Sequence, residues 1–358
     1  MFGLGREKDF VGLDIGSYSI KAVELRHRKK NENAFELKKI GYELLPHDAI
    51  VEGTIIDSAS VAETIKMVFE ENKIKNKDVV ISISGNSVII KKISLPSMES
   101  EELAESIIWE AKHNIPYPYE ETNVDYAIID PPERAGERNL DILLVAAKKD
   151  KIANYSAVVN QANKSLEAIE VDVFALQNAA EVNYPEIVQN NTLSIVNIGA
   201  NITNVIIIEK GNPQLFRDLS MGGSFFTENL SKDLSISFDE SEKLIKGLPV
   251  KEVQTEQLQT VLDMNIQNLL EEIEKTFSFY EAGETKAKKI DYILLSGGLS
   301  KLKNLTGSFQ QKFHIRTEVF NPFRNIHYDE KKFDSIYFDE LAAIFGVATG
   351  LASRRMEK

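Results

Sequence analysis

The chain of 358 residues contains no cysteine, which excludes disulfides, thiolate metal sites and cysteine nucleophiles. None of its five histidines forms a pair at the spacing that places two ligands on one face of a helix, so we expect no zinc site. Positive charge is also scarce, with 42 Lys and Arg against 55 Asp and Glu. Because nucleic acid and anionic lipid attract dense basic surfaces, we expect neither as a partner.

Long apolar runs are absent as well. A membrane-spanning helix needs about 20 consecutive apolar residues, and no segment approaches that length. Residues 1–5 are too short for the apolar core of a signal peptide, and Asp9 soon follows them. These features predict a cytoplasmic protein with no direct membrane insertion. The basic stretch 26–30 precedes Glu32 and Glu36, so we interpret it as the solvated tip of a hairpin.

Hydrophobic periodicity, by contrast, runs through the whole chain, whose length predicts two or three packed units. The first part predicts three strands, a helix and a buried strand, at 10–15, 19–26, 35–44, 58–72 and 79–84. We expect Ser58 or Ser60 to cap the helix, because a hydroxyl can accept a hydrogen bond from a free amide at a helix start.

The pattern changes after Asn86. It predicts a strand at 88–95, a helix that starts at Ser100 and stops before Pro116, strands at 124–129 and 140–147, and a helix at 150–163. The hydroxyl of Ser100 and the two glutamates after it favour a helix start. This β-α-β-β-α unit is large enough to be an inserted subdomain.

The second half repeats the layout of the first. Residues 10–25 and 194–209 both predict a strand, a glycine turn and a returning strand, which indicates an internal duplication. We predict that the rest of this half is mostly helical, and that it closes with a strand, the Gly297-Gly298 turn and a last helix. The predicted elements are helices at 226–234, 239–246 and 261–279, a strand at 291–296 and a helix at 341–353.

The common phosphate-binding loops are missing, since no Gly-x4-Gly-Lys-Ser/Thr run occurs and Gly3-Leu4-Gly5 lacks the third glycine of a dinucleotide fingerprint. The turn after the first strand is more informative, because Asp14 precedes Gly16 and a run of hydroxyl side chains. Glycine lets the backbone approach an anion closely, and turn amides bind phosphate. Asp14 would repel phosphate, so its sensible role is to hold the water shell of Mg²⁺. The alternative is an ordinary hairpin turn.

Three further turns share this character. Residues 197–203 repeat the first turn, 221–224 place two glycines before a helix, and 293–300 end a strand in a glycine pair that leaves a flat ledge for an adenine ring. Each alone could be a plain turn at the end of a strand. Together, and in this order, they favour a site that holds a nucleotide from two sides.

In kind and order these turns resemble the phosphate and adenosine motifs of the actin, sugar kinase and heat-shock chaperone ATPase superfamily. Within it the chain most resembles the PilM family of type IV pilus assembly, over essentially its whole length. The segments responsible are 12–25, Leu95-Pro96, Trp109-Glu110-Ala111, Ile115-Pro116-Tyr117-Pro118 and 348–354. The middle segments are the specific ones, because they lie in the insert that this family shares with the cell-division protein FtsA and cytoplasmic GspL domains.

The resemblance implies a two-domain α/β fold of the actin and heat-shock-chaperone ATPase type with an inserted β-α-β-β-α subdomain. Its first domain would comprise 1–88, 166–193 and 336–358, the insert 89–165, and the second domain 194–335. It also implies ATP and Mg²⁺ as ligands.

The resemblance assigns roles to individual residues. Around the phosphates and the metal it places Asp14, Gly16, Ser17, Tyr18, Ser19 and Lys21, with Asp14 reaching the metal through water. The opposing side would be Asn197, Gly199, Ala200, Asn201, Thr203, Gly222 and Gly223. Gly297, Gly298 and Leu299 would border the adenine. The ribose would lie beside Glu242 and either Lys243 or Lys246.

Two positions bear on hydrolysis. Asp172 lies where relatives carry an acid that can position the attacking water, although it could equally be a helix N-cap. The second phosphate turn of the superfamily normally carries aspartate, and this chain has Asn197. An amide brings no charge to hold Mg²⁺ or to orient a nucleophile. Phosphoryl transfer depends on positioning and electrostatics, so we expect ATP binding with at most very slow ATPase activity.

The insert carries the prediction about partners. Residues 115–119 are apolar, aromatic and stiff, which suits a wall for an extended peptide, although the same segment could pack on its own domain. The resemblance implies a groove between the insert and the first domain that receives the cytoplasmic amino-terminal tail of PilN. It also implies recruitment to the inner membrane through that partner and a role in pilus assembly and twitching motility. Other pilus and motor components, and a homo-oligomer, are compatible with it.

Two other functions fit the same fold. An FtsA-like cell-division adaptor would need an amphipathic membrane helix at its end, and residues 351–358 have no apolar face. A sugar or acetate kinase would need an acceptor pocket with a basic carboxylate, for which we find no motif. A filament-forming actin homologue remains open.

Overall fold

The computed structural model describes residues 9–28, 35–130, 139–251, 253–283, 289–333, 338 and 340–354. Residues 1–5, which were expected not to form a signal peptide, lie outside the described residues, as do the end of the basic stretch, the turn 131–138 and residues 355–358.

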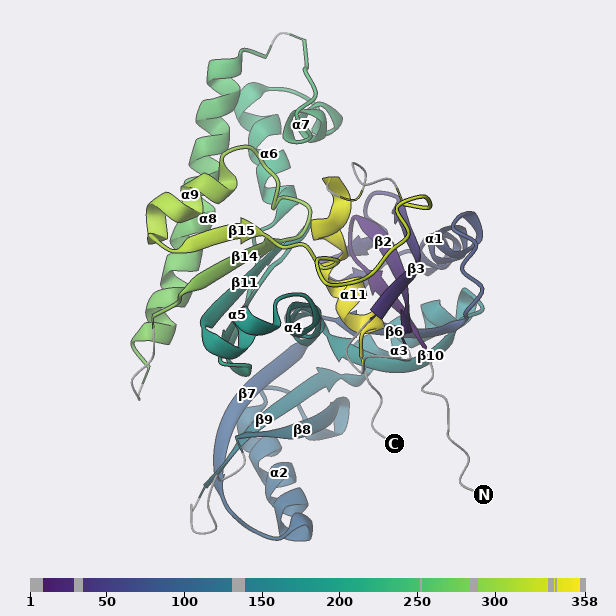
Figure 1. Ribbon diagram of the computed structural model, residues 1–358, viewed down its shortest axis with the longest axis vertical. Coiled ribbons are helices and arrows are strands. Elements are labelled where there is room, and N and C mark those ends of the chain that lie inside the picture. The colour runs from purple at the N-terminus through teal and green to yellow at the C-terminus, as the bar shows by residue number, and fades with distance from the viewer. Residues whose placement is uncertain are drawn as a thin grey trace.

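A five-stranded sheet forms the centre of the first domain (Figure 1). Three antiparallel strands follow one another as predicted, and two further strands lie parallel to the first of them. In order across the sheet the strands are β10 (Ser165–Val171), β6 (Asp78–Ile83), β1 (Val11–Ile15), β2 (Ser19–His27) and β3 (Phe35–Leu44). A small hairpin, β4 (Ile50–Val51) and β5 (Thr54–Ile55), follows β3.

The second domain has a sheet of the same design, so the internal duplication is confirmed. Its order is β13 (Asn212–Leu219), β12 (Thr203–Glu209), β11 (Thr192–Ile198), β14 (Tyr292–Ser296) and β15 (Arg316–Val319). Again three antiparallel strands are extended by two parallel ones. The expectation that the rest of this half is mostly helical is wrong at β13 and β15, which form the two edges of the sheet.

Helices α4 (Asp172–Asn183) and α11 (Gly346–Ala352) lie between the sheets (Figure 1). Side chains of both helices and of both sheets share one hydrophobic cluster. The helices approach so closely that a Cβ on Gly350 would lie 1.6 Å from the carbonyl oxygen of Ala175, so only glycine fits. Helix α5 (Pro185–Asn190) follows α4, and a short 3-10 turn, η2 (Ala342–Phe345), precedes α11.

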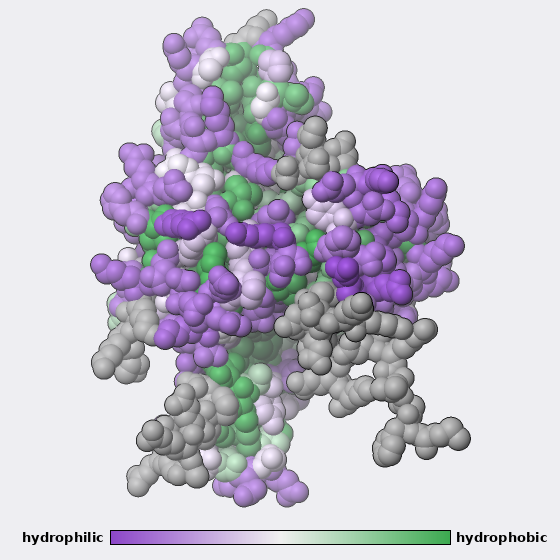
Figure 2. All heavy atoms as spheres, viewed as in Figure 1, coloured by the Kyte–Doolittle hydropathy of each residue, from purple (hydrophilic) through white to green (hydrophobic). Residues whose placement is uncertain are grey.

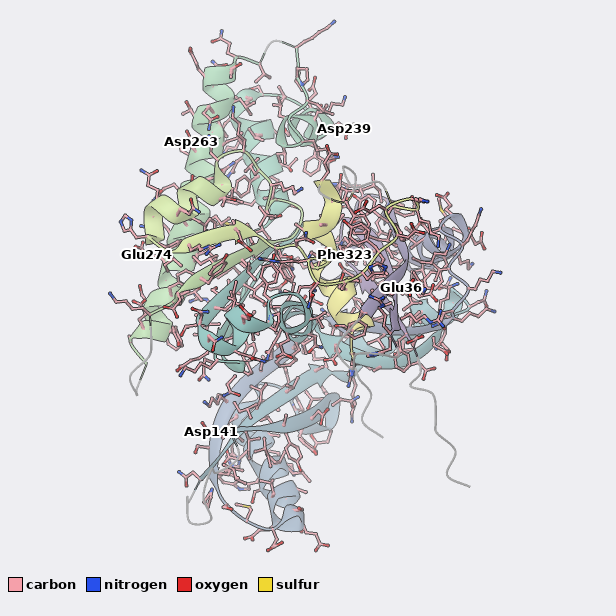
Figure 3. All side chains as sticks on the ribbon, viewed as in Figure 1. Glu36, Asp141, Asp239, Asp263, Glu274 and Phe323 are labelled. Carbon is pink, nitrogen blue, oxygen red and sulfur yellow. The ribbon has the colours of Figure 1, made fainter. Side chains whose placement is uncertain are left out.

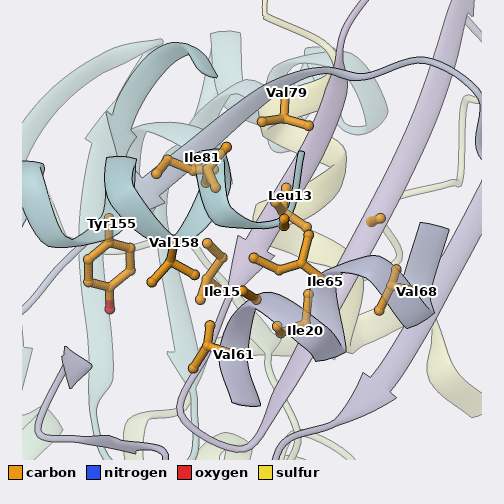
Figure 4. Close-up of a cluster of buried hydrophobic side chains, with 14 of the residues drawn as sticks. Leu13, Ile15, Ile20, Val61, Ile65, Val68, Val79, Ile81, Tyr155 and Val158 are labelled. Atoms are coloured by element: carbon orange, nitrogen blue, oxygen red, sulfur yellow. The ribbon is translucent and has the colours of Figure 1, made fainter. Parts of the chain in front are cut away.

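Helices α1 (Ser58–Glu71) and α3 (Lys149–Gln161) share a buried cluster with the first sheet. Figure 4 shows Val158 of α3 beside Ile15 and Ile81 of the sheet, with Tyr155 of the same helix in the same cluster. Asp57, rather than Ser58 or Ser60, caps α1, and its side chain accepts a hydrogen bond from the amide of Ser60. The prediction failed because the carboxylate one residue earlier is an equally good cap.

Four helices complete the second domain: α6 (Gly223–Leu234), α7 (Phe238–Ile245), α8 (Thr255–Glu281) and α9 (Leu305–Phe313). Apart from α7, they contribute buried side chains to one cluster with the second sheet. Among the described helices, none combines the length and apolar character needed to cross a membrane.

The insert is a three-stranded antiparallel sheet with one helix on it, at the bottom of Figure 1. Its order is β7 (Val88–Pro96), β9 (Asn139–Lys148) and β8 (Thr122–Asp130), and α2 (Ser100–Asn114) and η1 (Tyr119–Glu121) join β7 to β8. Leu103, Ile107 and Ala111 of α2 are buried on this sheet. The N-cap of α2 is Glu99 with no side-chain cap bond, so the expected hydroxyl cap at Ser100 is wrong.

The β-α-β-β-α order is confirmed, but its last helix packs elsewhere. The buried side chains of α3 belong to the cluster of the first domain, and none belongs to the cluster of the insert. Salt bridges such as Lys92–Asp141 at 2.9 Å join β7 to β9 inside the insert (Asp141 is labelled in Figure 3). We therefore propose limits of 88–148 for the insert.

The chain also returns to the first domain before residue 336. Phe323 and Ile326 share a buried cluster with β2 and β3. The amide of Leu37 donates to the carbonyl of His327 at 2.8 Å, which adds this segment to the edge of β3. Phe323 and Glu36, both labelled in Figure 3, lie on these neighbouring segments.

Candidate functional site

The parallel strands of each sheet end at one edge, and most of the predicted residues lie there. In the first sheet, β1 ends before Gly16, β6 before Ser84 and β10 before Asp172. In the second, β11 ends before Gly199 and β14 before Gly297. The carboxyl ends of parallel strands are where α/β folds bind ligands. A Cβ on Gly85 would lie 3.2 Å from Cδ1 of Ile202, so the two edges meet.

The first turn, 16–19, is closed by one hydrogen bond and leaves other donors free. The amide of Gly16 donates to the carbonyl of Ser19 at 3.2 Å. Within the described part of the chain, no protein group accepts a hydrogen bond from the amides of Ser17 and Tyr18. Two adjacent amides without a protein acceptor can donate to an anion, which is the role that the sequence predicts for this turn.

Asp14 and Lys21 form an ion pair beneath this turn. Their Oδ2 and Nζ atoms are 3.1 Å apart, and the side chains are only 15% and 13% exposed. Burial raises the pKa of Asp14, the charge of Lys21 partly offsets this rise, and the charge of Asp172 adds to it. The structure thus brings three predicted residues into one electrostatic group. The alternative of Asp172 as a helix N-cap is wrong, because the N-cap of α4 is Val171.

The second turn, 199–202, has the same design. The amide of Gly199 donates to the carbonyl of Ile202 at 3.0 Å, and the amides of Ala200 and Asn201 have no protein acceptor in the described ranges. The hydroxyl of Thr203 donates to the carbonyl of Met221 at 2.6 Å. Asn201 accepts a hydrogen bond from Ser224 at 2.6 Å. These two side chains shape the turn, and the backbone offers the donors.

Gly222 and Gly223 support the second turn in another way than predicted. The amide of Gly223 donates to the carbonyl of Gly199 at 2.9 Å, so it is not available to an anion. A Cβ on Gly222 would lie 2.6 Å from the carbonyl oxygen of Ala200. The glycine pair therefore lets α6 start directly against the turn.

Asn197 begins a chain of side-chain hydrogen bonds that reaches a carboxylate. Its amide donates to Asn204 at 3.1 Å, and Asn204 donates to Asp218 at 2.8 Å. The other oxygen of Asp218 accepts from the amide of Gly85 in the first domain at 2.7 Å. Burial raises the pKa of Asp218, and the hydrogen bond from Asn204 partly opposes that rise. The carboxylate that the second turn lacks at Asn197 is thus replaced, two strands away, by that of Asp218 at the end of this chain of hydrogen bonds.

The predicted adenine ledge is only partly as expected. Gly297 has φ of +88°, and a Cβ there would lie 2.3 Å from the carbonyl oxygen of Ile198. Gly298 faces open space, since among the described residues beyond its chain neighbours no atom lies within 4 Å of the place a Cβ would take. The side chain of Leu299 is buried in the core of the second domain, so it does not line the ledge. A shallow pocket of about 370 Å³ lies further along, between Ser300 and Gly307, outside the predicted set.

Glu242 and Lys246 lie across from the first turn. The hydroxyl of Tyr18 donates to Glu242 at 3.0 Å, and Nζ of Lys246 donates to that hydroxyl at 2.8 Å. Lys246, which follows the last residue of α7, also bonds Glu242 four residues earlier, at 3.4 Å. The structure selects Lys246 over Lys243 for this cluster. The cluster of Tyr18, Glu242 and Lys246 connects the two domains at the edge where the turns meet.

Sequence reasoning missed three groups at this edge. Nζ of Lys151 donates to the carbonyl of Ser84 at 2.6 Å, and the hydroxyl of Tyr155 donates to the carbonyl of Gly53 at 3.2 Å. Asp218 is the third. The Ser84-Gly85 pair follows a buried strand, like the other glycine turns, so the sequence could have indicated it as part of the site. Lys151 stands in an ordinary run of polar residues, which gives no such indication.

A metal would have few direct protein ligands here. In the described residues, no three Asp, Glu or His side chains lie close enough together to hold a metal ion. Mg²⁺ usually keeps several waters and needs only one or two carboxylates beside the phosphates. Asp14 at the turn fits that requirement through water.

Comparison with known proteins agrees with this geometry. The family model for type IV pilus assembly protein PilM matches residues 12–356. The chain belongs to the PilM family. A solved structure of the PilM–PilN type IV pilus biogenesis complex is 24% identical, covers 97% of this chain and 98% of that chain, and superposes with a TM-score of 0.86. The predicted actin-type fold is therefore confirmed for this PilM-family chain.

More distant relatives share the fold. The cell division protein FtsA of Bacillus subtilis (strain 168) is 22% identical, and the match spans 67% of the chain and only 58% of that protein. FtsA of Streptococcus pneumoniae is also 22% identical, over 89% of the chain and 77% of that protein. A structure of MreB5 of Spiroplasma citri bound to ADP is 13% identical, with a TM-score of 0.52 and coverage of 96% and 94%.

Proposed function

We propose that this protein is an ATP-binding cytoplasmic scaffold of the type IV pilus machinery that binds the amino-terminal cytoplasmic tail of PilN. The observation that carries the proposal is the match of the PilM family model to residues 12–356. The solved relative that contains PilN supports the choice of partner. This role would recruit the protein to the inner membrane through PilN and link that membrane protein to the motor side.

Two pairs of free amides support nucleotide binding. The amides of Ser17 and Tyr18 on one side, and of Ala200 and Asn201 on the other, would hold the phosphates. Asp14 would bind Mg²⁺ through water, and open space at Gly298 leaves room for the adenine. A bound Mg²⁺ would neutralise phosphate charge between the turns. The charge of the ion also makes a buried, ionised Asp14 less costly.

The same geometry favours slow hydrolysis. Asn197 carries no charge and its amide is already engaged with Asn204. Asp172, the acid just after β10, could position a water. The opposing turn has no carboxylate to assist it, because residue 197 is asparagine. Because phosphoryl transfer depends on such positioning, we expect ATP to be held and cleaved very slowly, if at all.

The insert is the proposed contact for the PilN tail. Figure 2 shows hydrophobic surface on the insert at the bottom of the view, below a largely hydrophilic body. Its large exposed hydrophobic side chains are Ile108, Trp109, Tyr126 and Ile128. Residues 115–119 pack partly on the insert, since Ile115 is buried in its hydrophobic cluster. The hydroxyl of Tyr117 donates to the carbonyl of Asn86, just before the insert, at 2.6 Å. The peptide would therefore bind against a segment, 115–119, that is held in place by these contacts.

A calorimetric titration of the PilN tail peptide, with and without Mg-ATP, tests the proposal. We expect saturable binding of the tail peptide and no binding of a scrambled peptide of the same composition. Equal affinities with and without Mg-ATP would mean that ATP is structural, whereas different affinities would make it a switch. Absence of tail binding under both conditions would refute the partner assignment. In a thermal-shift comparison of ATP with a panel of sugars, a shift produced by a sugar as well as by ATP would favour the kinase alternative.

A further inference from the structure

A buried lysine stands at the edge where the phosphate turns meet. Lys151 lies in the first turn of α3, and its side chain is only 8% exposed. Nζ donates one hydrogen bond, to the carbonyl of Ser84 at 2.6 Å. An ammonium group has three donors. No carboxylate forms an ion pair with it in the part of the chain that the structure describes.

The sheet order places Ser84, the hydrogen-bond partner of this ammonium, between two strands whose ends carry acids. Ser84 follows β6, which pairs with β1 on one side and with β10 on the other. The ends of those strands carry Asp14 and Asp172. One turn later in α3, Tyr155 lies close enough to both acids that their charges, together with burial, raise its pKa. The start of α3 therefore faces the same edge.

Nζ of Lys151 has donors without a hydrogen-bond acceptor among the described residues, since its one acceptor there is the carbonyl of Ser84. Burial lowers the pKa of Lys151, and the charges of Asp172, Asp218 and Asp150 oppose that effect. Asp150 accepts a hydrogen bond from the backbone amide of Lys151 at 2.6 Å, but in the described residues none of the three acids forms an ion pair with Nζ. A buried cation is costly for the fold when its partners are one carbonyl and the ring of Tyr155, whose centroid is 5.7 Å from Nζ. A phosphate that entered between the turns would supply the missing partner, and lysine binds phosphate as a point charge.

We propose that Lys151 binds the terminal phosphate of a nucleoside triphosphate and gives the site its preference for triphosphate over diphosphate. The inference rests on the proposed nucleotide binding. The turns of Asp14 and Gly199 would hold the inner phosphates, and Lys151 would lie at the far end of the chain of phosphates. The competing role is a structural one, in which the ammonium braces Ser84 so that Gly85 can donate to Asp218.

Binding of Mg-ADP and of a non-hydrolysable Mg-ATP analogue to the full-length protein separates these roles. Lys151→Gln removes the charge but keeps an amide donor for the carbonyl of Ser84. Lys151→Arg keeps the charge. We expect Lys151→Gln to weaken the triphosphate analogue by about tenfold or more, as for a charge-assisted bond, and to change ADP affinity by less than about twofold. Lys151→Arg should retain most of the preference.

Lys149→Gln is the matched control, because Lys149 lies in the same turn of α3, is exposed and donates to the carbonyl of Glu120 at 2.7 Å. It should leave both affinities unchanged. An unchanged ratio of the two affinities in Lys151→Gln, or a wild-type protein that binds both nucleotides equally, would overturn the inference alone. A wild-type protein that binds neither nucleotide would overturn the proposed function as well. Melting without nucleotide identifies any loss of folding, in which case the ratio in Lys151→Arg decides: a lost preference refutes the proposal.

Discussion

Single side chains at this site depend on charges that lie far away in the sequence. The second turn carries an amide at Asn197, yet it is connected through Asn204 to the carboxylate of Asp218. On the first turn, Asp14 is paired with Lys21 and feels the charge of Asp172. Asp14 and Asp172 therefore come from the first domain and Asp218 from the second. Changes in stability with pH should reveal how these carboxylates titrate.

The pKa of Asp14 gives a prediction for pH dependence. Because burial raises this pKa above its unfolded value of 3.8, ionised Asp14 destabilises the folded protein at neutral pH. The cost shrinks as pH falls through the folded pKa and is gone below 3.8. We expect Asp14→Asn, without nucleotide, to gain stability relative to wild type as pH rises from acid to neutral. Denaturant melts at several pH values measure this, and the same variant should lose Mg²⁺-dependent nucleotide affinity.

Asp57 is a control of opposite sign. Hydrogen bonds from the hydroxyl and the amide of Ser60 lower the pKa of Asp57. Its contribution to stability is therefore present above the unfolded pKa and disappears as pH falls through the lower folded pKa. Wild type should lose its advantage over Asp57→Ala in acid. Parallel pH profiles for wild type and Asp14→Asn would contradict the prediction for Asp14.

Among the elements, the strands and long helices were predictable because their periodicity is local. The strand at 35–44 agrees residue for residue with β3, and the buried face of α2 was visible from Leu103, Ile107 and Ala111. The missed strands β10, β13 and β15 all lie at sheet edges. Edge strands are short or polar on one side, so their pattern is weak. The pattern of α3 shows which of its faces is buried but not against which sheet. Both the first sheet and the sheet of the insert were possible.

The packing of α3 predicts how the insert can be removed. Val88 and Ala147 are paired across β7 and β9, and the amide of Lys148 donates to the carbonyl of Ser87, so the ends of the insert lie side by side. Deletion of 89–147 with a short glycine-serine linker should leave a folded protein that binds nucleotide and has lost the PilN tail. Circular dichroism melts and nucleotide titration measure this.

Deletion of 89–165 is the comparison, because it also removes α3. Tyr155, Val158 and Val159 are buried in the first domain, and the loss of several such side chains at about 2–5 kcal/mol each exceeds the stability of a typical domain. We expect that variant to be unfolded. If both deletions behaved alike, α3 would not be part of the first domain. Tail binding retained after deletion of 89–147 would instead refute the insert as the PilN contact.

At the scale of the whole molecule, a few polar contacts join the domains at the nucleotide edge. Tyr18 contacts Glu242 and Lys246 of α7, Gly85 contacts Asp218, and the rings of His47 and Phe238 lie 5.1 Å apart. The apolar joint between the sheets, around α4 and α11, lies behind this edge. Such an arrangement allows the edge to open about a fixed apolar joint.

Tyr18→Phe should therefore speed nucleotide release. It removes both hydrogen bonds of the hydroxyl while Glu242 and Lys246 keep their own contact at 3.4 Å. At a net value of about 0.5–1.5 kcal/mol per hydrogen bond, the two bonds together are worth about 1–3 kcal/mol. We therefore expect release to be faster by about fivefold or more, with little change in melting temperature. Stopped-flow displacement of a fluorescent ADP analogue measures the rate.

Lys243→Ala serves as the control for Tyr18→Phe, because Lys243 lies on the same helix but outside this cluster. It should release nucleotide at the wild-type rate. An unchanged rate in Tyr18→Phe would mean that these bonds do not restrain the edge.

The sequence alone determined the duplicated strand–turn–strand units, the glycine turns at 16 and 199, the order of elements in the insert and the superfamily. These features follow from spacing within a few residues, where backbone geometry and hydrophobic period leave little choice. The tertiary structure decided that α3 packs on the first sheet, that the Gly223 amide is already occupied, and that Lys151 and Asp218 lie near the turns. The contact of Tyr18 with Glu242 joins residues 224 positions apart, and that of Gly85 with Asp218 joins residues 133 apart. Such contacts depend on the path of the whole chain, which no local pattern encodes.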